Sequence, residues 1–182
     1  TQLGVHPRLG LLMVEAQRHG CSQIGCDLAA LLSDRDPLSA AEVGCDLEAR
    51  LEAMREQKRC KPLLDLSRQL ERQLARLEID PDAESTGIDS AQLILTAFPS
   101  WLALQRPGQT GRYRLRQGRG AILRPADPLA GSEALAVARL DMGQRDTRIQ
   151  LAVPLSRQRV EQLALEQGEW LDQVTWDDKS ER

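Results

Sequence analysis

The stretch GRYRLRQGRGAIL, residues 111–123, decides the fold, because the sequence pattern changes here. Apolar and basic residues alternate over residues 113–116, which is typical of a strand with one buried and one solvated face. Two glycines then flank Arg119, and the apolar run 121–123 follows. We therefore predict a β-hairpin whose turn contains glycine.

Strand-like segments continue on the C-terminal side of this hairpin. Residues 135–140 and 147–153 are rich in alanine, leucine and valine, and a polar segment joins them. A serine at position 156 can cap a short helix that reaches about residue 167. Residues 170–176 could form a last edge strand. These elements predict a small antiparallel, OB-like β-barrel.

Helices dominate the N-terminal side. Apolar residues recur at helical spacing in five segments. These are residues 7–20, 22–32, 46–59, 62–77 and 89–98. Residues 79–87 have no periodicity and are rich in turn formers, so we expect a linker there. The predicted fold is α+β: a helical bundle in a domain 1–87, then a barrel domain 88–182 with a leading helix.

Arginine is concentrated around the hairpin of an otherwise acidic chain. The formal net charge is −3, yet residues 98–125 contain six arginines and no carboxylate. These are Arg106, Arg112, Arg114, Arg116, Arg119 and Arg124. On a strand, the spacing of two from Arg112 to Arg116 places three guanidinium groups on one face.

Such a face can bind a polyanion. Guanidinium groups bind phosphate oxygens in a bidentate manner and stack on bases, so the cluster favours contact with RNA or DNA. The predicted nucleic-acid-binding residues are Arg112, Arg114, Arg116, Arg119 and Arg124. An alternative is a solvated strand face that keeps an edge from pairing with other chains. Aromatic residues for base stacking are scarce, and only Trp101 and Tyr113 are near.

No motif of a catalytic centre is present. The sequence lacks the nucleotide-binding pattern G-x-x-x-x-G-K-[ST], and neither histidine has a serine or cysteine partner pattern around it. The four cysteines form no C-x-x-C pair, so we expect buried structural thiols and no zinc site. We expect this chain alone to have no catalytic residue, no metal and no cofactor.

The chain carries no sign of export or membrane insertion. No apolar run approaches the roughly 20 residues that a spanning helix needs. No basic region followed by an apolar region resembles a signal peptide. Free thiols fit the cytoplasm, which is the expected location. The first residues resemble the tail of an element already under way, so the chain is expected to be a fragment.

Several motifs occur in the order found in DEAH-box helicases. Residues 6–9 (HPRL), 26–32 (CDLAALL) and 35–38 (RDPL) resemble the helicase-associated region of that family. Residues 93–99 (LILTAFP) and 117–121 (QGRGA) resemble its bacterial HrpB branch. The weakest stretch of the resemblance is residues 39–87.

The resemblance implies a helical bundle, called the ratchet domain in this family, followed by an OB-like barrel. In the family, both cover an RNA channel formed with two RecA-like motor domains, which hydrolyse ATP and move 3′ to 5′. The implied partners are single-stranded RNA, with DNA left open, and motor domains of the same chain. ATP and Mg²⁺ would belong to that motor, upstream of this fragment.

The chain departs from the branch pattern at one place. Where the branch usually carries Asp-Arg, this chain has Ser100 and Trp101, so that charged contact is not carried over. The Gly-Arg-Gly element does match, which makes Arg119 the best single candidate for contact with the RNA backbone. Arg8 also matches, and we expect it to hold the helix start against a neighbouring element.

Three functions from different classes remain open at this point. The main hypothesis is an accessory RNA-binding region of an ATP-dependent helicase, which guides a single strand past the motor. The second is a protein-interaction scaffold, motivated by the acidic helical half and by a leucine stripe from Leu63 to Leu77 that we expect to be exposed. The third is a free-standing OB-type binding protein.

Overall fold

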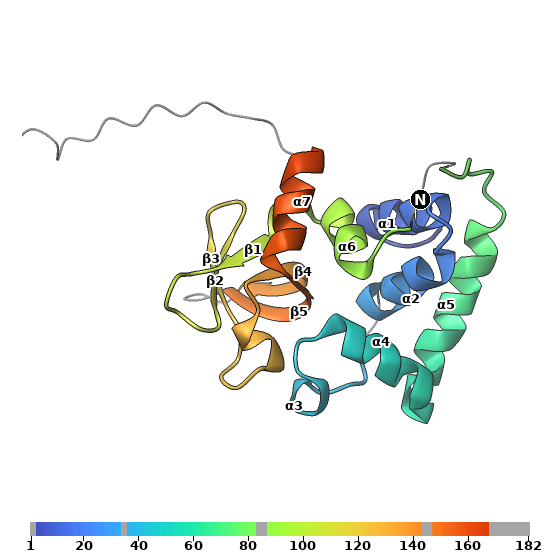
Figure 1. The fold of residues 1–182 in the computed structure, drawn as a ribbon. Coiled ribbons are helices and arrows are strands. Elements are labelled where there is room, and N and C mark those ends of the chain that lie inside the picture. The colour runs from blue at the N-terminus through green and yellow to red at the C-terminus, as the bar shows by residue number, and fades with distance from the viewer. Residues whose placement is uncertain (1–2, 34–35, 83–86, 143–146, 168–182) are drawn as a thin grey trace, which may run out of the picture.

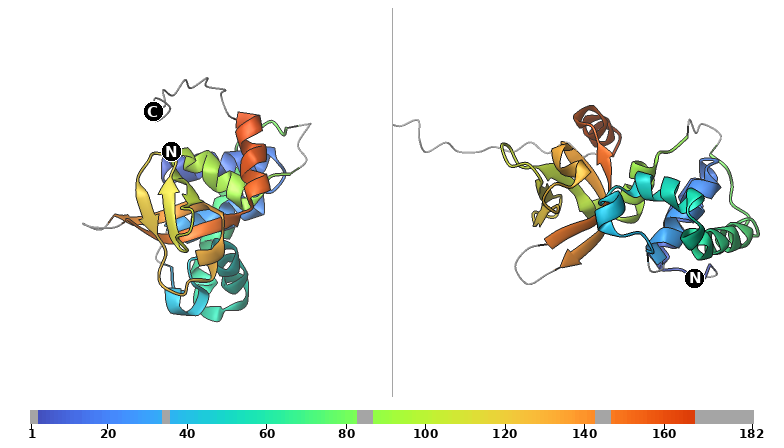
Figure 2. Two further views of the ribbon diagram at one scale, coloured as in Figure 1. Left: turned by 60° about the vertical axis from the view of Figure 1, so that its left-hand side comes forward. Right: turned by 90° about the horizontal axis from the view of Figure 1, so that it is seen from below.

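The computed structural model describes residues 3–33, 36–82, 87–142 and 147–167. A group of helices packs beside a five-stranded barrel, as Figures 1 and 2 show from three directions. The predicted α+β class is therefore confirmed. Residues 83–86 of the predicted linker and the predicted strand at 170–176 lie outside the described residues.

All five helices predicted on the N-terminal side are present. They are α1 (Pro7–Arg18), α2 (Ser22–Ser33), α4 (Leu47–Glu56), α5 (Lys61–Leu74) and α6 (Ser90–Ala97). Their ends follow capping chemistry: the Asp46 carboxylate accepts from the first turn of α4, and the Asp89 carboxylate accepts from Gln92 N at 2.7 Å. A short helix α3 (Ala40–Val43) and a 3₁₀ turn η1 (Lys58–Cys60) are additional.

Five strands close the barrel in the order β1-β2-β3-β5-β4. They are β1 (Leu102–Gln105), β2 (Arg112–Leu115), β3 (Gly120–Ile122), β4 (Ala134–Met142) and β5 (Thr147–Leu155). The 3₁₀ turns η2 (Pro99–Trp101) and η3 (Pro128–Gly131) precede β1 and β4, and α7 (Arg157–Gln167) follows β5. The predicted hairpin corresponds to β2 and β3.

The barrel is mixed, so the prediction of a wholly antiparallel barrel is wrong. Strands β3 and β5 pair in parallel, with Ala121 opposite Thr147 and Ile122 opposite Arg148. The reason is geometric: around a closed ring of five strands, directions cannot alternate everywhere, so one neighbouring pair must be parallel. Because this pairing joins segments that are distant in the sequence, no local sequence pattern predicts it.

Residues 134–138 of β4 and 151–155 of β5 are largely buried on both faces. Leu135, Val137 and Ile149 pack inside the barrel with Tyr113. The opposite faces form one core with the helices, in which Ala136 and Val153 join Leu12, Leu28 and Ile94. The small alanines of β4 let α6 approach closely. One apolar core thus extends across the boundary predicted near residue 87, although that division remains a prediction.

The leucine stripe of α5 belongs to this core. Leu63, Leu70 and Leu74 are buried, and Leu66 and Leu77 are half-buried. This face of α5 packs against α2. The expected exposure of the stripe is therefore wrong, because a second helix covers it.

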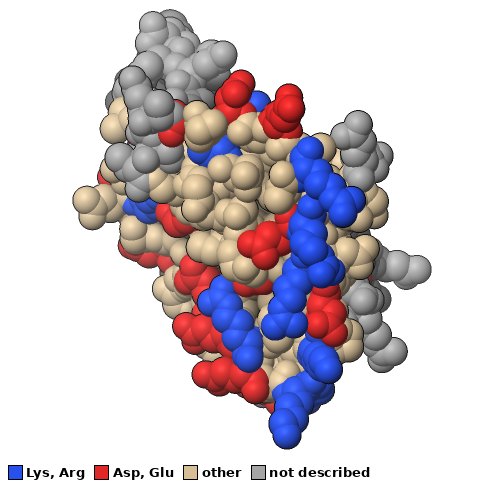
Figure 3. All heavy atoms as spheres, turned by 90° about the vertical axis from the view of Figure 1, so that its right-hand side faces the viewer, with Lys and Arg blue, Asp and Glu red and all other residues tan. Residues whose placement is uncertain are grey.

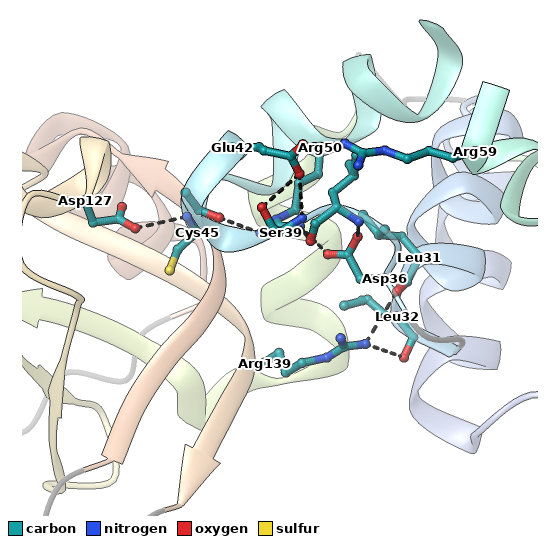
Figure 4. A network of polar contacts seen from close by, with 12 residues as sticks. Leu31, Leu32, Asp36, Ser39, Glu42, Cys45, Arg50, Arg59, Asp127 and Arg139 are labelled. Atoms are coloured by element: carbon teal, nitrogen blue, oxygen red, sulfur yellow. Dashed lines mark hydrogen bonds and ion pairs between the residues drawn. The ribbon is translucent and has the colours of Figure 1, made fainter. Parts of the chain in front are cut away.

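Polar contacts hold the loop between α2 and α4 against the barrel (Figure 4). Buried Arg50 pairs with Asp36 and donates to the carbonyl oxygens of Leu38 at 3.0 Å and Gly44 at 2.6 Å. From the barrel side, the Asp127 carboxylate accepts from Cys45 N at 3.0 Å. Arg139 of β4 donates to the Leu32 carbonyl at 3.1 Å, at the end of α2.

One short pairing joins the loop directly to the barrel wall. Asp46 forms an isolated parallel bridge with Ala152 of β5, and Ala152 N donates to Cys45 O at 2.9 Å. Strand β3 pairs only with the first residues of β5, so the loop occupies the edge that β3 leaves open.

Candidate nucleic-acid interface

The outward face of β2 presents arginines, as the alternation predicts. Arg112 and Arg114 are exposed, while Tyr113 and Leu115 are buried in the barrel. Arg116 follows the strand and is also exposed, and its N–H donates to Leu102 O at 2.8 Å. We call Arg112, Arg114 and Arg116 the β2 arginine face. Within the described part of the chain, none of the three forms an ion pair.

A cavity of about 520 Å³ adjoins this face, between β1, β2 and α7. Arg114 and Arg116 line it together with apolar side chains. The apolar lining consists of Leu95, Pro99, Leu102, Leu104, Leu115, Val160, Leu163 and Ala164. Leu104 lies opposite Arg114 in the sheet register and is 47% exposed. The site therefore combines two cationic groups with an apolar surface.

Arg119 lies in the tight turn between β2 and β3. Gly118 has a φ of +90° and donates from its N–H to Leu115 O at 2.7 Å, a backbone conformation that favours glycine. The Arg119 carbonyl accepts from Leu115 N at 2.8 Å, and its side chain is exposed. Glycine at position 120 leaves room for Arg106, because a Cβ there would lie 3.3 Å from Nη2 of that residue.

Arg124 does not share this environment. It lines a different cavity with Glu42, Gly44 and Asp127, at the junction of the barrel and the α3 region. Two carboxylates therefore lie in the surroundings of Arg124, in contrast to the β2 arginine face. The arginine-rich segment is thus divided between two sites.

The nearby aromatic rings have structural contacts. The Tyr113 ring is buried, its hydroxyl lies 3.0 Å from the carbonyl oxygens of Leu129 and Ser132, and burial raises its pKa. Trp101 stacks on Phe98 with ring centroids 4.7 Å apart. The Arg8 guanidinium lies 5.4 Å from the Phe98 centroid, which is the structural contact expected for Arg8.

The cysteines are free thiols, as expected. Burial is the main cause that raises the pKa values of Cys26 and Cys45 to about 12, so both remain protonated at neutral pH. Among the described residues, no three potential ligands gather into a metal site. None of the described helices has the length and apolar character required to cross a bilayer.

Comparisons with known proteins identify a relative. No family model matches the chain. It is 30% identical over 179 residues, 97% of its length, to the ATP-dependent RNA helicase HrpB of Escherichia coli K12, and it covers 20% of that protein. The crystal structure of the E. coli DExH-box NTPase HrpB superposes with a TM-score of 0.74 and 28% identity over 97% of this chain and 20% of that one.

A second crystal structure, of the E. coli DEAH/RHA helicase HrpB, gives a TM-score of 0.66 and 28% identity, covering 86% of this chain and 18% of that one. The predicted resemblance to HrpB is therefore confirmed. The chain spans about a fifth of the length of these relatives.

Proposed function

We propose that this chain, which resembles a segment of the ATP-dependent RNA helicase HrpB, is the nucleic-acid-binding accessory region of such a helicase. The observation that carries the proposal is the β2 arginine face, whose three exposed guanidinium groups have no carboxylate partner in the described chain. A phosphate backbone supplies the missing negative charge.

The geometry of the face suits a single strand. Alternate residues of a strand lie about 6.6 Å apart, so the three side chains form a short line of positive charge. The adjoining cavity offers apolar walls beside Arg114 and Arg116, which would accept an unstacked base while the guanidinium groups hold its phosphates. Arg119 would extend this line from the neighbouring turn. Arg124 is the weakest of the predicted contacts because Glu42 and Asp127 share its cavity.

In the proposed parent protein, RecA-like motor domains would hydrolyse ATP with Mg²⁺, and this region would guide single-stranded RNA past them. The parent would act in the cytoplasm. No residue of this chain is assigned a step in ATP hydrolysis.

The scaffold alternative loses one of the two observations that motivated it, because the leucine stripe of α5 packs against α2. The free-standing binding module differs from the helicase region in one testable respect. A gene that encodes an ATPase motor before this region would exclude the free-standing binding module.

Replacing all three residues of the β2 arginine face by glutamine tests the binding role. We expect the salt dependence of the affinity for single-stranded RNA, plotted as log K against log salt, to become shallower by about 2, since each phosphate contact contributes about 0.7. The matched Arg→Lys triple variant keeps the charges and should keep the slope. A glutamine variant with the wild-type slope would contradict the proposal.

A further inference from the structure

A second line of basic side chains runs along the outer face of α5, on the far side of the molecule from β2. It consists of Lys61, Arg68 and Arg72 of the helix and Arg76 of the turn that continues it. We call these four residues the α5 ridge. All four are exposed. Figure 3 shows this side of the molecule, where Lys and Arg side chains gather in a line.

Helical geometry explains the alignment. With 3.6 residues per turn, positions separated by seven, eleven and fifteen residues return to nearly the same direction. The buried residues Leu63, Leu70 and Leu74 point the opposite way, toward α2. Packing of the apolar stripe therefore fixes the basic stripe toward solvent.

Few ion pairs form along the ridge in the described part of the chain. Among the described residues of the ridge, only Arg68 has an ion pair, since it contacts Asp65 at 3.1 Å. In the described residues, Lys61, Arg72 and Arg76 make no ion pair. Two arginines of the preceding segment are neutralised by comparison: Arg55 pairs with buried Asp27 at 2.9 Å, and Arg59 pairs with Glu42 at 3.0 Å.

The arrangement is unfavourable for the isolated helix. Arg68 and Arg72 are like charges at the i,i+4 spacing, which destabilises a helix by a few tenths of a kcal/mol. Lys61 is the first residue of α5, where the helix dipole disfavours a cation. The dipole favours Arg72 in the last turn, but it does not explain the other members of the line. A bound polyanion would relieve both costs.

We infer that the α5 ridge is a second binding surface for a phosphodiester backbone, separate from the β2 arginine face. Residues four apart on a helix lie about 6 Å apart along the axis, so Arg68 and Arg72 present regularly spaced cations, and Arg76 follows in the turn after α5. A basic stripe along one helix is the electrostatic footprint of nucleic-acid binding. Figure 1 places α5 and the hairpin β2–β3 at opposite ends of the molecule, so a short strand cannot occupy both surfaces.

Stoichiometry with a short RNA tests this inference on the whole chain. We expect an oligouridylate of about eight nucleotides to bind at two sites per chain at low salt, as measured by titration calorimetry. The variant Arg72→Gln/Arg76→Gln should bind at one site, and its overall salt slope should become shallower by about 1.4. The charge-retaining variant Arg72→Lys/Arg76→Lys should retain two sites.

The outcomes separate the two surfaces. Replacing Arg112 and Arg114 by glutamine removes the same charge from the barrel, and this variant should also retain one site, now on α5. If Arg72→Gln/Arg76→Gln keeps the wild-type stoichiometry and slope, the α5 ridge is not a nucleic-acid surface, whatever the barrel variant does. Titration with polyglutamate tests an acidic protein partner instead. If Arg72→Gln/Arg76→Gln loses binding to polyglutamate but keeps its binding to RNA, the inference is overturned in favour of an acidic protein partner.

Discussion

Arg50 at the junction and Arg114 on the barrel carry the same guanidinium group in opposite settings. Arg50 is 2% exposed and is satisfied by Asp36 and two carbonyl oxygens, although its Nε has no partner. Arg114 is exposed and has no ion pair within the described chain. The difference teaches that acceptors supplied by the fold commit an arginine to structure, while their absence leaves it available to a ligand.

Replacement of Arg50 should have the largest effect on the free energy of unfolding. We expect Arg50→Met to destabilise the chain by about 3 kcal/mol, because Asp36 loses its cation and two buried carbonyls lose their donor. Urea unfolding would measure the change. The matched variant Arg114→Met should shift the free energy of unfolding by less than about 0.5 kcal/mol. Equal effects of the two variants would refute the distinction between a structural arginine at position 50 and a ligand-binding arginine at position 114.

Asp127 tests the junction from the barrel side. It is buried and accepts from Cys45 N and Leu129 N, each at 3.0 Å. We expect Asp127→Ala to cost about 2 kcal/mol, since two buried N–H groups lose a charged acceptor. Asp127→Asn retains an acceptor oxygen and should cost less in thermal unfolding. A larger loss in Asp127→Asn than in Asp127→Ala would contradict the assigned contacts.

Arg139 should have a smaller effect. Its guanidinium reaches the last carbonyls of α2, at 3.1 Å from Leu32 O and 3.4 Å from Leu31 O, and it is only partly buried. We expect Arg139→Gln to cost about 1 kcal/mol in urea unfolding, because water can replace part of the contact. An unchanged unfolding midpoint would show that this contact does not stabilise the junction.

The smallest expected effect belongs to the β2 arginine face. Replacing Arg112, Arg114 and Arg116 by glutamine should change the free energy of unfolding by less than about 0.5 kcal/mol, because no described counter-ion is lost. Thermal unfolding at low and high salt would measure this. A loss above about 1 kcal/mol would mean that these side chains support the barrel, and the functional assignment would weaken accordingly.

Local patterns in the sequence predicted most elements correctly. Leucine at helical spacing predicts α5, and the alternation at Tyr113 and Leu115 predicts which face of β2 is buried. Serine at position 156 precedes α7 as expected, and its hydroxyl accepts from Arg159 N. The outward direction of the β2 arginine face follows from the same alternation, so this part of the candidate site was predictable.

Features that depend on distant partners were not predictable. Strand β1 has only four residues, and its position depends on pairing with both β2 and β4. Arg50 belongs to a segment that resembles a solvated helix, and only the loop folded over it buries its side chain. Arg124 and Arg114 look equivalent in the sequence, yet tertiary packing places two carboxylates in the cavity of Arg124, and the described lining of the cavity beside Arg114 contains none.

The bridge between Asp46 and Ala152 has a mechanical consequence. If the barrel moved over the helices, that bridge would break and the Cys45 carbonyl would lose its hydrogen-bond donor. The apolar outer side of β4 and β5 would also become exposed. Movement of the hairpin relative to α5 at this point would therefore break these contacts, which favours a constant distance between the two basic surfaces.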